Sequence, residues 1–206
     1  MPTKTTRPTA RAPSTARGEA TRRKILQAAE QEFGSRGFHA ASVAGITAAG
    51  GVAQGTFYIY FPSKEAIFRE LVRDVGRQLR QAMREATRGA PDRLSGERRG
   101  LEAFVRFISA HPQLYRIVQE ANFVDEQVYR DYYNDLARGY ARVLEDAAAQ
   151  GELRPGDAEV RAWAVMGMGH FLGLRYCLWQ GREPSKATMD AVMDFIAHGM
   201  APDALG

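Results

Sequence analysis

The sequence predicts an all-α fold of about nine helices. Apolar residues recur every three or four positions along most of the 206-residue chain, which is the period of one helix face. The strict alternation of apolar and polar residues that indicates a half-buried strand is missing from the sequence. Glycine and proline divide the helical pattern into separate elements. We expect a three-helix N-terminal domain followed by a larger helical domain.

The N-terminal elements are short and begin or end at recognisable residues. Residues 1–20 contain almost no large apolar side chain, so they are predicted to form a disordered basic arm. A first helix is predicted over residues 21–36, with Gly37 at its end. Ser42 is a plausible N-cap for a second helix, which ends at Gly50 and Gly51. A third helix is expected over residues 53–61.

Longer helices follow. Ser63 is predicted to cap a fourth helix, and a loop is expected over residues 89–96. A fifth helix carries the apolar stripe of residues 101–108 and ends at His111. The remaining predicted helices begin with a short one near residue 114 and continue over residues 125–150, 157–180 and 186–200. The expected domains are therefore residues 21–68 and residues 69–206.

Two short helices that meet at residues 50–52 are typical of a helix-turn-helix. In that motif the second helix enters the major groove of DNA. The third predicted helix presents Gln54, Thr56, Tyr58 and Tyr60, which are poorly suited to a core. The Gln54 amide can bind adenine through two hydrogen bonds, and Thr56 can contact a base edge. For the two tyrosines, partial packing against the first helix is the alternative.

The distribution of charge agrees with DNA binding. Residues 1–64 contain nine Lys or Arg and three acidic residues, a net charge of +6 in a chain whose total is +4. Neutralisation of phosphate charge dominates the affinity of proteins for DNA, so a basic N-terminal part is expected of such a protein. Within the arm, Lys4, Arg7, Arg11 and Arg17 could follow the DNA backbone, although a solubilising tail is the alternative.

Residues 21–68 resemble the DNA-binding domain of the TetR family of bacterial transcriptional regulators. The most specific stretch is Gly55-Thr56-Phe57-Tyr58-x-Tyr60-Phe61-x-Ser63-Lys64-Glu65. The resemblance implies a homodimeric repressor that reads a pseudo-palindromic double-stranded DNA operator and is released by a small-molecule effector. It places the DNA contacts at Ser42, Gln54, Gly55, Thr56, Tyr58, Tyr60 and Lys64, with Tyr58 and Lys64 on phosphates.

The chain also departs from the family pattern. Gly45 occupies a position where an acidic residue is common, so the capping box begun by Ser42 is incomplete. Ala53 replaces the usual Ser or Thr cap of the third helix, a change that typically costs ~1 kcal/mol. Ala44 lies where family members often have a longer residue that contacts DNA, so this contact is expected to be missing.

The larger domain is rich in aromatic residues, and the resemblance implies an effector pocket there. Plain core packing is the alternative reading of each of these residues. The chemistry of the ligand stays open beyond a hydrophobic or amphipathic character, because Glu120 or Asp131 would suit a cation, whereas Arg116, Asn122, His170 or Arg175 would suit a carboxylate, acyl group or thioester. The candidate pocket residues are Phe104, Phe107, Tyr115, Phe123, Tyr132, Trp163, Met166, His170 and Phe171.

The last two helices are candidates for a dimer face. Small residues allow another helix to approach closely, but internal packing explains the glycines of residues 167–173 nearly as well. The dimer of the family, joined through its last two long helices, favours the first reading. The predicted face consists of Gly169, Gly173, Leu174, Leu178, Val192, Met193 and Ile196.

The other functional classes have weaker support. The four histidines are scattered along the sequence, away from other residues at metal-ligand spacing. Asp190, Asp194 and His198 share one helix face and are interpreted as solvent-exposed. No metal, cofactor or enzymatic activity is therefore expected. Cys177 is the single cysteine and reads as buried core, which fits a cytoplasmic, nucleoid-associated protein. The mostly apolar stretch of residues 160–180 also contains charged side chains, so it does not predict a membrane span. An architectural DNA-binding protein without an effector is the main alternative.

Overall fold

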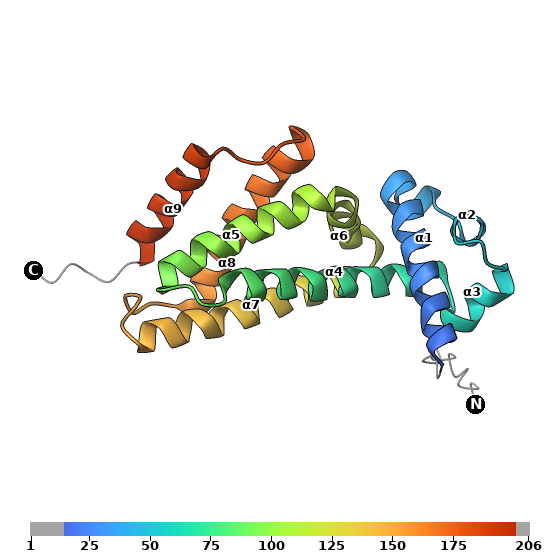
Figure 1. Cartoon of the computed structure of the whole chain (residues 1–206), viewed down its shortest axis with the longest axis horizontal. Helices are drawn as coiled ribbons and strands as arrows, with labels where there is room; N and C mark the ends of the chain where they lie inside the picture. The colour runs from blue at the N-terminus through green and yellow to red at the C-terminus, as the bar shows by residue number, and fades with distance from the viewer. Residues whose placement is uncertain (1–14, 201–206) are drawn as a thin grey trace, which may run out of the picture. The chain divides into compact units, whose positions relative to one another are not determined.

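A computed structural model describes residues 15–200 of the chain (Figure 1). Helices account for all of its regular structure within these residues. Their order and bounds are α1 (Ala16–Ala40), α2 (Val43–Ala49), α3 (Gln54–Tyr60), α4 (Lys64–Thr87), α5 (Arg93–Ala110), α6 (Pro112–Val124), α7 (Glu126–Ala149), α8 (Ala158–Leu172), the π-helix η1 (Gly173–Trp179) and α9 (Lys186–Met200).

The chain divides into two compact units. Unit 1 comprises Met1–Asp74 and Arg116–Tyr129, and unit 2 comprises Val75–Tyr115 and Arg130–Gly206. The helices α4, α6 and α7 each contribute residues to both units. The predicted domain boundary after residue 68 falls inside α4.

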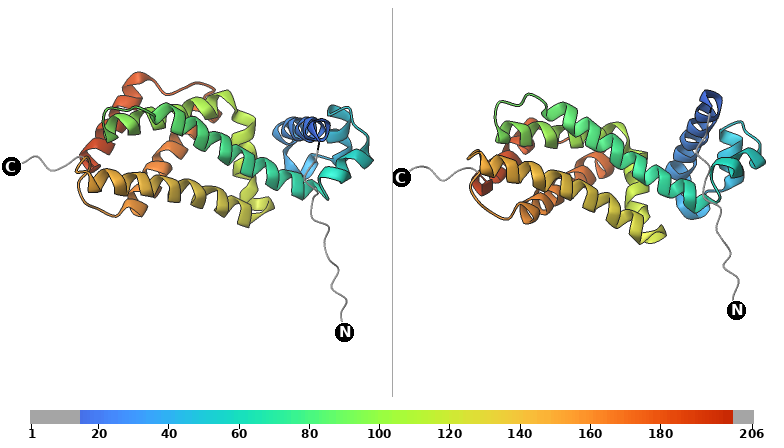
Figure 2. Two further views of the ribbon diagram at one scale, coloured as in Figure 1. Left: turned by 60° about the horizontal axis from the view of Figure 1, so that its bottom comes forward. Right: turned by 90° about the horizontal axis from the view of Figure 1, so that it is seen from below.

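In unit 1, the helices α1, α2 and α3 lie side by side (Figure 2) and enclose an aromatic core. The rings of Phe33 and Phe68 pack edge to face, with their centroids 5.3 Å apart, and Phe38 lies 4.9 Å from Phe68. Ile46 of α2 and Phe57 of α3 are fully buried. Burying each such side chain contributes about 1.5–3 kcal/mol, so the short helices α2 and α3 are held mainly by this core.

The N-terminal helix is longer than predicted. It begins at Ala16, where the Thr15 hydroxyl caps it by accepting a hydrogen bond from the Gly18 N–H at 3.1 Å. Residues 16–20 are therefore helical and not part of a disordered arm, and Lys4, Arg7 and Arg11 lie outside the described residues. Gly37 has a φ of 75° and interrupts α1 at the predicted place, with one further turn beyond it.

In unit 2, α5 packs against α8, η1 and α9. The buried core includes Val105, Ile108, Leu144 and Leu153. Gly173, at the start of η1, allows an especially close approach, because a Cβ built on it would lie 2.4 Å from Cδ1 of Ile108. A side chain at this position would force the buried Ile108 side chain to move.

Three helix boundaries in this part of the chain differ from the predictions. The loop predicted over residues 89–96 is too long, because Asp92 caps α5 by accepting a hydrogen bond from the Ser95 N–H at 2.7 Å. The helix α6 extends from Pro112 to Val124 and is not short. The predicted helix of residues 157–180 changes to π-helical geometry at Gly173. None of the described helices is long and apolar enough to cross a membrane.

Candidate functional site

The helix α3 exposes one stripe of side chains. It buries Phe57, while Gln54, Gly55, Tyr58 and Ile59 face outward, with 51% of Tyr58 and 65% of Ile59 exposed. Two other predicted contact residues, Thr56 and Tyr60, are half-buried. Gly51 has a φ of 54° in the turn that joins α2 to α3, a backbone conformation that favours glycine.

Ile59 was not predicted as a contact residue. An isoleucine in a helical pattern reads as core, and only the orientation of α3 reveals that it is exposed. An outward apolar side chain on a helix of this kind can contact a thymine methyl group. Gly55 lies beside it on the same stripe, and a Cβ built on Gly55 would meet nothing within 4 Å. The fold of the chain itself therefore does not require glycine there.

The N-terminus of α2 is capped by residues from two helices. The Ser42 hydroxyl accepts a hydrogen bond from the Gly45 N–H at 2.9 Å, as predicted. The carboxylate of Glu32 on α1 accepts one from the Ser42 N–H at 3.3 Å. Glu32 thus supplies the acidic partner that the local sequence lacks at position 45. By contrast, α3 has no side-chain cap at Ala53, as its sequence predicted.

Lys64, the first residue of α4, holds the junction between α1 and α2. Its ammonium group donates hydrogen bonds to the carbonyl oxygens of Phe38 at 2.7 Å and Ala41 at 2.9 Å. The same group lies 4.4 Å from the centre of the Phe38 ring. An ammonium group has three N–H donors, so one remains for a phosphate. The phosphate contact implied by the resemblance stays a prediction.

Glu120 of α6 binds the same junction. Both of its carboxylate oxygens accept the Phe38 N–H, at 2.8 and 2.9 Å. A Cβ at Gly37 would lie 3.0 Å from Oε1 of Glu120, so this close approach and the positive φ both favour glycine. Nearby, Arg69 of α4 pairs with Asp125 at 3.2 Å. Glu120 therefore has a structural partner in unit 1.

Three basic side chains of α1 have no acidic partner within the described residues. Arg17, Arg23 and Lys24 are exposed, whereas the neighbouring Arg22 pairs with Glu70 at 3.2 Å. Lys24 lies near the turn of the helix-turn-helix, because a Cβ built on Gly51 would be 3.5 Å from its Nζ. Charge counting predicted a basic N-terminal part, but not that Lys24 lies beside this turn.

Comparison with known proteins identifies this unit. The family model described as "Bacterial regulatory proteins, tetR family" matches residues 25–71. The chain is 28% identical over 190 residues to the uncharacterized HTH-type transcriptional regulator YdgC of Bacillus subtilis (strain 168), which covers 90% of this chain and 95% of that protein. It is 32% identical over 105 residues to the HTH-type transcriptional activator FasR of Mycolicibacterium smegmatis, covering 51% of this chain and 48% of that protein.

The fold also resembles that of a solved structure. The solved structure of Salmonella enterica GusR superposes with a TM-score of 0.76 at 22% identity, over 87% of this chain and 94% of that one. The chain contains the DNA-binding domain of the TetR family. It is a DNA-binding transcription regulator, and members of this family are not enzymes. Within the described residues, no group of three or more His, Cys, Asp or Glu side chains could hold a metal ion.

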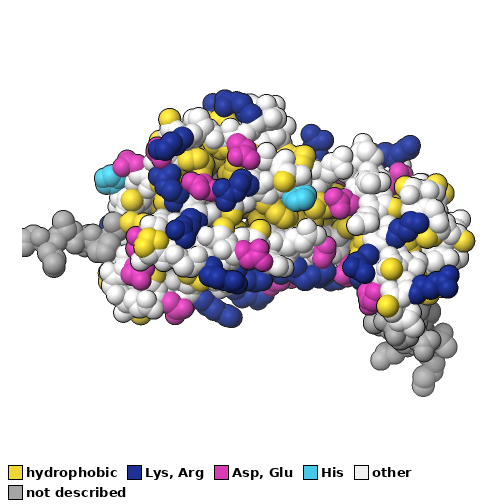
Figure 3. Space-filling view, in the orientation of Figure 1, with side chains coloured by type: hydrophobic (Ala, Val, Ile, Leu, Met, Phe, Trp, Pro, Cys, Tyr) yellow, Lys and Arg dark blue, Asp and Glu magenta, His cyan; other side chains and the backbone are white. Residues whose placement is uncertain are grey.

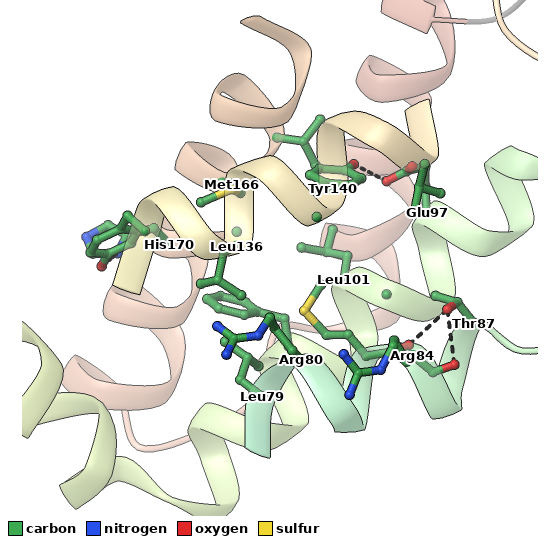
Figure 4. Close-up of a pocket in the computed structure, with 18 of the residues that line it drawn as sticks. Leu79, Arg80, Arg84, Thr87, Glu97, Leu101, Leu136, Tyr140, Met166 and His170 are labelled. Atoms are coloured by element: carbon green, nitrogen blue, oxygen red, sulfur yellow. Dashed lines mark hydrogen bonds between the residues drawn. The ribbon is translucent and has the colours of Figure 1, made fainter. Parts of the chain in front are cut away.

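Unit 2 of the chain contains a cavity of about 260 Å³ (Figure 4). Its wall is mostly apolar and comes from α4, α5, α7 and α8, with Tyr115 from the start of α6. Leu101, Leu136 and Met166 form its middle in Figure 4, between His170 and Glu97 at opposite ends. A concave apolar site with a few convergent polar groups is typical of small-molecule binding.

One polar end of the cavity contains a buried acidic group. Glu97 is 4% exposed, lies 2.9 Å from Nε of Arg93 and accepts a hydrogen bond from the Tyr140 hydroxyl. Burial raises the pKa of Glu97, while the charge of Arg93 opposes this shift. Burial and the neighbouring carboxylate raise the pKa of Tyr140 well above its usual value of 10.0. The ion pair with Arg93 compensates the charge of Glu97 within the chain, although Nε of Arg93 and Oε1 of Glu97 are buried without a well-aligned hydrogen bond.

The other polar end is centred on His170. Its Nδ1 lies 2.6 Å from the Tyr115 hydroxyl and 3.3 Å from the Tyr133 hydroxyl. Burial lowers the pKa of His170, so the imidazole is neutral near pH 7. In the neutral imidazole Nδ1 accepts a hydrogen bond from a hydroxyl group or donates one to it, depending on which ring nitrogen carries the proton. This end of the cavity is polar but uncharged.

Five of the nine predicted pocket residues lie together around this cavity. Phe104, Tyr115, Tyr132, Met166 and His170 line the cavity. The other four predicted residues do not: Phe107 is buried elsewhere, and the exposed aromatics are Phe123, Trp163 and Phe171. Helical spacing identifies aromatic residues on a helix, but it does not show whether they face inward or outward.

The charged candidates for ligand binding also require correction. Glu120 binds the Phe38 N–H in unit 1, and the cavity wall does not include Asp131, Arg116, Asn122 or Arg175. The wall instead contains Arg80 and Arg84 of α4. The sequence reads as an ordinary charged helix there, so only the packing of unit 2 reveals that these two side chains reach the cavity.

The glycines predicted for the dimer face pack within the chain. A Cβ on Gly169 would lie 3.3 Å from Leu101 of α5, and Gly173 approaches Ile108. Met193 and Ile196 are buried as well, while Leu174, Leu178 and Val192 are half-buried. Internal packing therefore explains the glycines. The outward apolar residues of these helices are Val160, Trp163, Phe171, Trp179 and Phe195.

Proposed function

We propose that this chain is a homodimeric repressor that leaves its operator when a small molecule enters the cavity of unit 2. The observation that carries the proposal is the apolar cavity, because its wall is built from helices that continue into the DNA-binding unit. The TetR-family DNA-binding domain of the chain supports operator binding by α3.

The coupling route follows two helices. In α4, Leu79 and Arg80 line the cavity, and Lys64 at the start of the same helix binds the carbonyl groups of Phe38 and Ala41. In α6, Tyr115 lines the cavity, and Glu120 accepts the Phe38 N–H. Both helices therefore hold the junction that precedes α2. A ligand that binds one arrangement of α4 and α6 more tightly than another would shift the protein toward that arrangement. This shift would change the position of the reading helices, α2 and α3.

Dimerisation is proposed through the outward face of α8, η1 and α9. Trp179 and Phe195 are 72% and 70% exposed, and large apolar side chains that face outward in a patch often mark an interface. On the face drawn in Figure 3, apolar side chains (yellow) also gather beside α9. A two-fold dimer would present two copies of α3 to half-sites about 34–36 Å apart, or a multiple of that spacing.

The operator part of the proposal is tested with fluorescence anisotropy. The probe is DNA from immediately upstream of the protein's own gene, with unrelated DNA as competitor and a salt titration. We expect tight, competitor-resistant binding that is weakened by Tyr58→Ala and Lys24→Gln. If Lys24 contacts phosphate, its substitution lowers the salt dependence by about one ion per lost contact. Arg88→Gln removes an exposed charge outside the DNA-binding unit and serves as the matched control.

Two results would contradict the operator proposal. Weak binding that is indifferent to sequence would favour an architectural DNA-binding protein. Equal losses in Lys24→Gln and Arg88→Gln would mean that the affinity reflects only the total charge of the chain. Transcription from the same upstream DNA in a reconstituted system then separates repression from activation, since the relative FasR is named an activator.

A further inference from the structure

The charges on the cavity wall identify the kind of effector that fits it. Three cationic side chains line the cavity, Arg80, Arg84 and Arg93, against a single acidic one, Glu97. Glu97 lies 2.9 Å from Arg93 and accepts the Tyr140 hydroxyl, so this pair is compensated. Arg80 and Arg84 remain, and neither forms an ion pair within the described part of the chain.

The two arginines are placed together by the helix that carries them. They are four residues apart on α4, so they lie on the same helix face, where like charges repel. Arg80 is half-buried and Arg84 is exposed. In Figure 4, Arg80 extends from α4 beside Leu79, and Arg84 lies further along the same helix toward Thr87. Two arginines one helical turn apart in the wall of an apolar cavity are suited to binding an anion, because each can donate paired hydrogen bonds to a carboxylate or phosphate.

The remaining wall is suited to an apolar body. Leu79, Met83, Leu101 and Val165 contribute aliphatic surface, and the His170 end is neutral. One water takes roughly 30 Å³ in the liquid, so the cavity of about 260 Å³ holds on the order of nine groups of that size. This is the scale of a medium-length hydrocarbon chain or of one or two rings.

We propose that the effector is an anionic amphiphile whose apolar body fills the cavity and whose carboxylate or phosphate head binds Arg80 and Arg84. This inference rests on the proposed effector role of the cavity. A cationic amphiphile does not fit, because Glu97, the single acid of the wall, is already paired and the wall carries two uncompensated positive charges. A neutral amphiphile would leave both arginines without a counter-ion.

The test uses isothermal titration calorimetry on the full-length chain without DNA. The probes share a ten-carbon tail and differ in the head: decanoate, decyl phosphate, decanol and decyltrimethylammonium, each below its micelle concentration. We expect decanoate or decyl phosphate to bind at least tenfold more tightly than decanol, and decyltrimethylammonium to bind most weakly. The relative affinity of the two anions distinguishes a carboxylate ligand from a phosphate ligand.

Variants locate the head group. Arg80→Gln/Arg84→Gln should weaken the preferred anion at least tenfold and leave decanol within twofold. Arg88→Gln/Arg142→Gln removes the same charge from exposed positions outside the cavity wall and should change neither affinity. Equal weakening by both double variants would overturn the site, because the effect would then reflect net charge. Equal or tighter binding of decanol or decyltrimethylammonium would overturn the anionic class, as would the failure of both anions to bind at millimolar concentration.

A separate experiment distinguishes the proposed ligand class from the proposed ligand-driven release. The preferred anion is added to the complex of the protein with its operator DNA, and anisotropy is followed. Release supports both proposals. An anion that binds through Arg80 and Arg84 but leaves the DNA complex intact supports the ligand class and contradicts ligand-driven release. If decanol or the cation releases DNA and the anions do not, ligand-driven release stands and the anionic class is wrong.

Discussion

Gly55 is predicted to contact DNA, and a glycine at its position in a helix lowers stability. It is the second residue of α3 and lies on the outward stripe with Gln54, Tyr58 and Ile59. Glycine in a helix is about 1 kcal/mol less favourable than alanine. Because a Cβ at this position would meet nothing in the chain, the absence of a side chain is best explained by an approaching partner.

Replacing Gly55 with alanine is therefore expected to separate stability from DNA binding. Gly55→Ala should raise the free energy of unfolding by about 0.5–1 kcal/mol through helix propensity and weaken operator binding severalfold. Urea denaturation and anisotropy measure the two effects. Gly139→Ala in α7, where a Cβ also meets nothing, should give a similar gain in stability without weakening DNA binding. Unchanged operator affinity in Gly55→Ala would show that DNA does not approach this position closely.

His170 gives a prediction about pH. Burial lowers its pKa in the folded chain below the usual 6.5, so the unfolded chain binds more protons in the interval between the two values. The contribution of the neutral imidazole is complete above pH 6.5 and is lost as the pH falls toward the folded pKa. Denaturation curves should show this loss in the native chain and a smaller one in His170→Gln. An identical pH profile for the variant would contradict the assignment.

Local sequence patterns predicted the caps and the exposure of several residues of the helix-turn-helix, but not the contacts with distant residues that hold it in place. Ser42 caps α2, and Tyr58 is exposed, as their positions in the motif indicated. Glu120 and Phe38 are separated by 82 positions, so no helical period or capping rule could connect them. Ile59 was missed for a different reason, because an apolar residue in a short helix has the same pattern whether it faces the core or DNA.

At the scale of elements, the junction between α1 and α2 is held by side chains from two other helices. Glu120 of α6 binds the N–H of Phe38, and Lys64 of α4 binds its carbonyl group. The junction therefore depends on α4 and α6 for its conformation. Helix bounds were predicted well where a cap or glycine marks them, as at Gly37 and Ser42, and poorly at α5, where the cap at Asp92 was overlooked.

Removing the Glu120 carboxylate should loosen this junction. Glu120→Ala leaves the Phe38 N–H without its acceptor, which is expected to lower the free energy of unfolding by about 1–3 kcal/mol. Glu120→Gln retains one acceptor oxygen and should lose less. Hydrogen exchange of residues 38–41 and operator affinity report the same loosening. The control is Glu145→Ala, an exposed acid of α7 that should change neither; equal effects of Glu120→Ala and Glu145→Ala would refute the role of the junction contact.

At the scale of the whole molecule, the distribution of aromatic residues has two explanations. Tyr115 and Tyr132 line a cavity, whereas Trp179 and Phe195 face outward on the last helices. The sequence predicted aromatic enrichment and a role in ligand binding or assembly. It could not assign individual residues to either, because the inward direction of a helix depends on which neighbours pack against it.

The outward aromatics predict that assembly depends on α9. Phe195→Glu places a charge in the proposed dimer face and should convert a dimer to a monomer, measured by light scattering after gel filtration. Operator affinity should fall as well, because two linked reading helices bind more tightly than one. Phe123→Glu changes a phenylalanine of unit 1 that is 83% exposed and should leave the mass unchanged. A native chain that is already monomeric at micromolar concentration would contradict the dimer.

The cap that Glu32 places on α2 limits how the reading helices can be exchanged between proteins. A side chain at position 45 would occupy the space of this carboxylate, since its Cβ would lie 2.2 Å from Oε1. The acid at position 32 and the glycine at position 45 therefore depend on each other, although they lie on different helices. A chimera that receives α2 and α3 alone would inherit glycine at 45 without the acid that compensates for it. Transferring the DNA specificity of this chain to another regulator thus requires α1 as well.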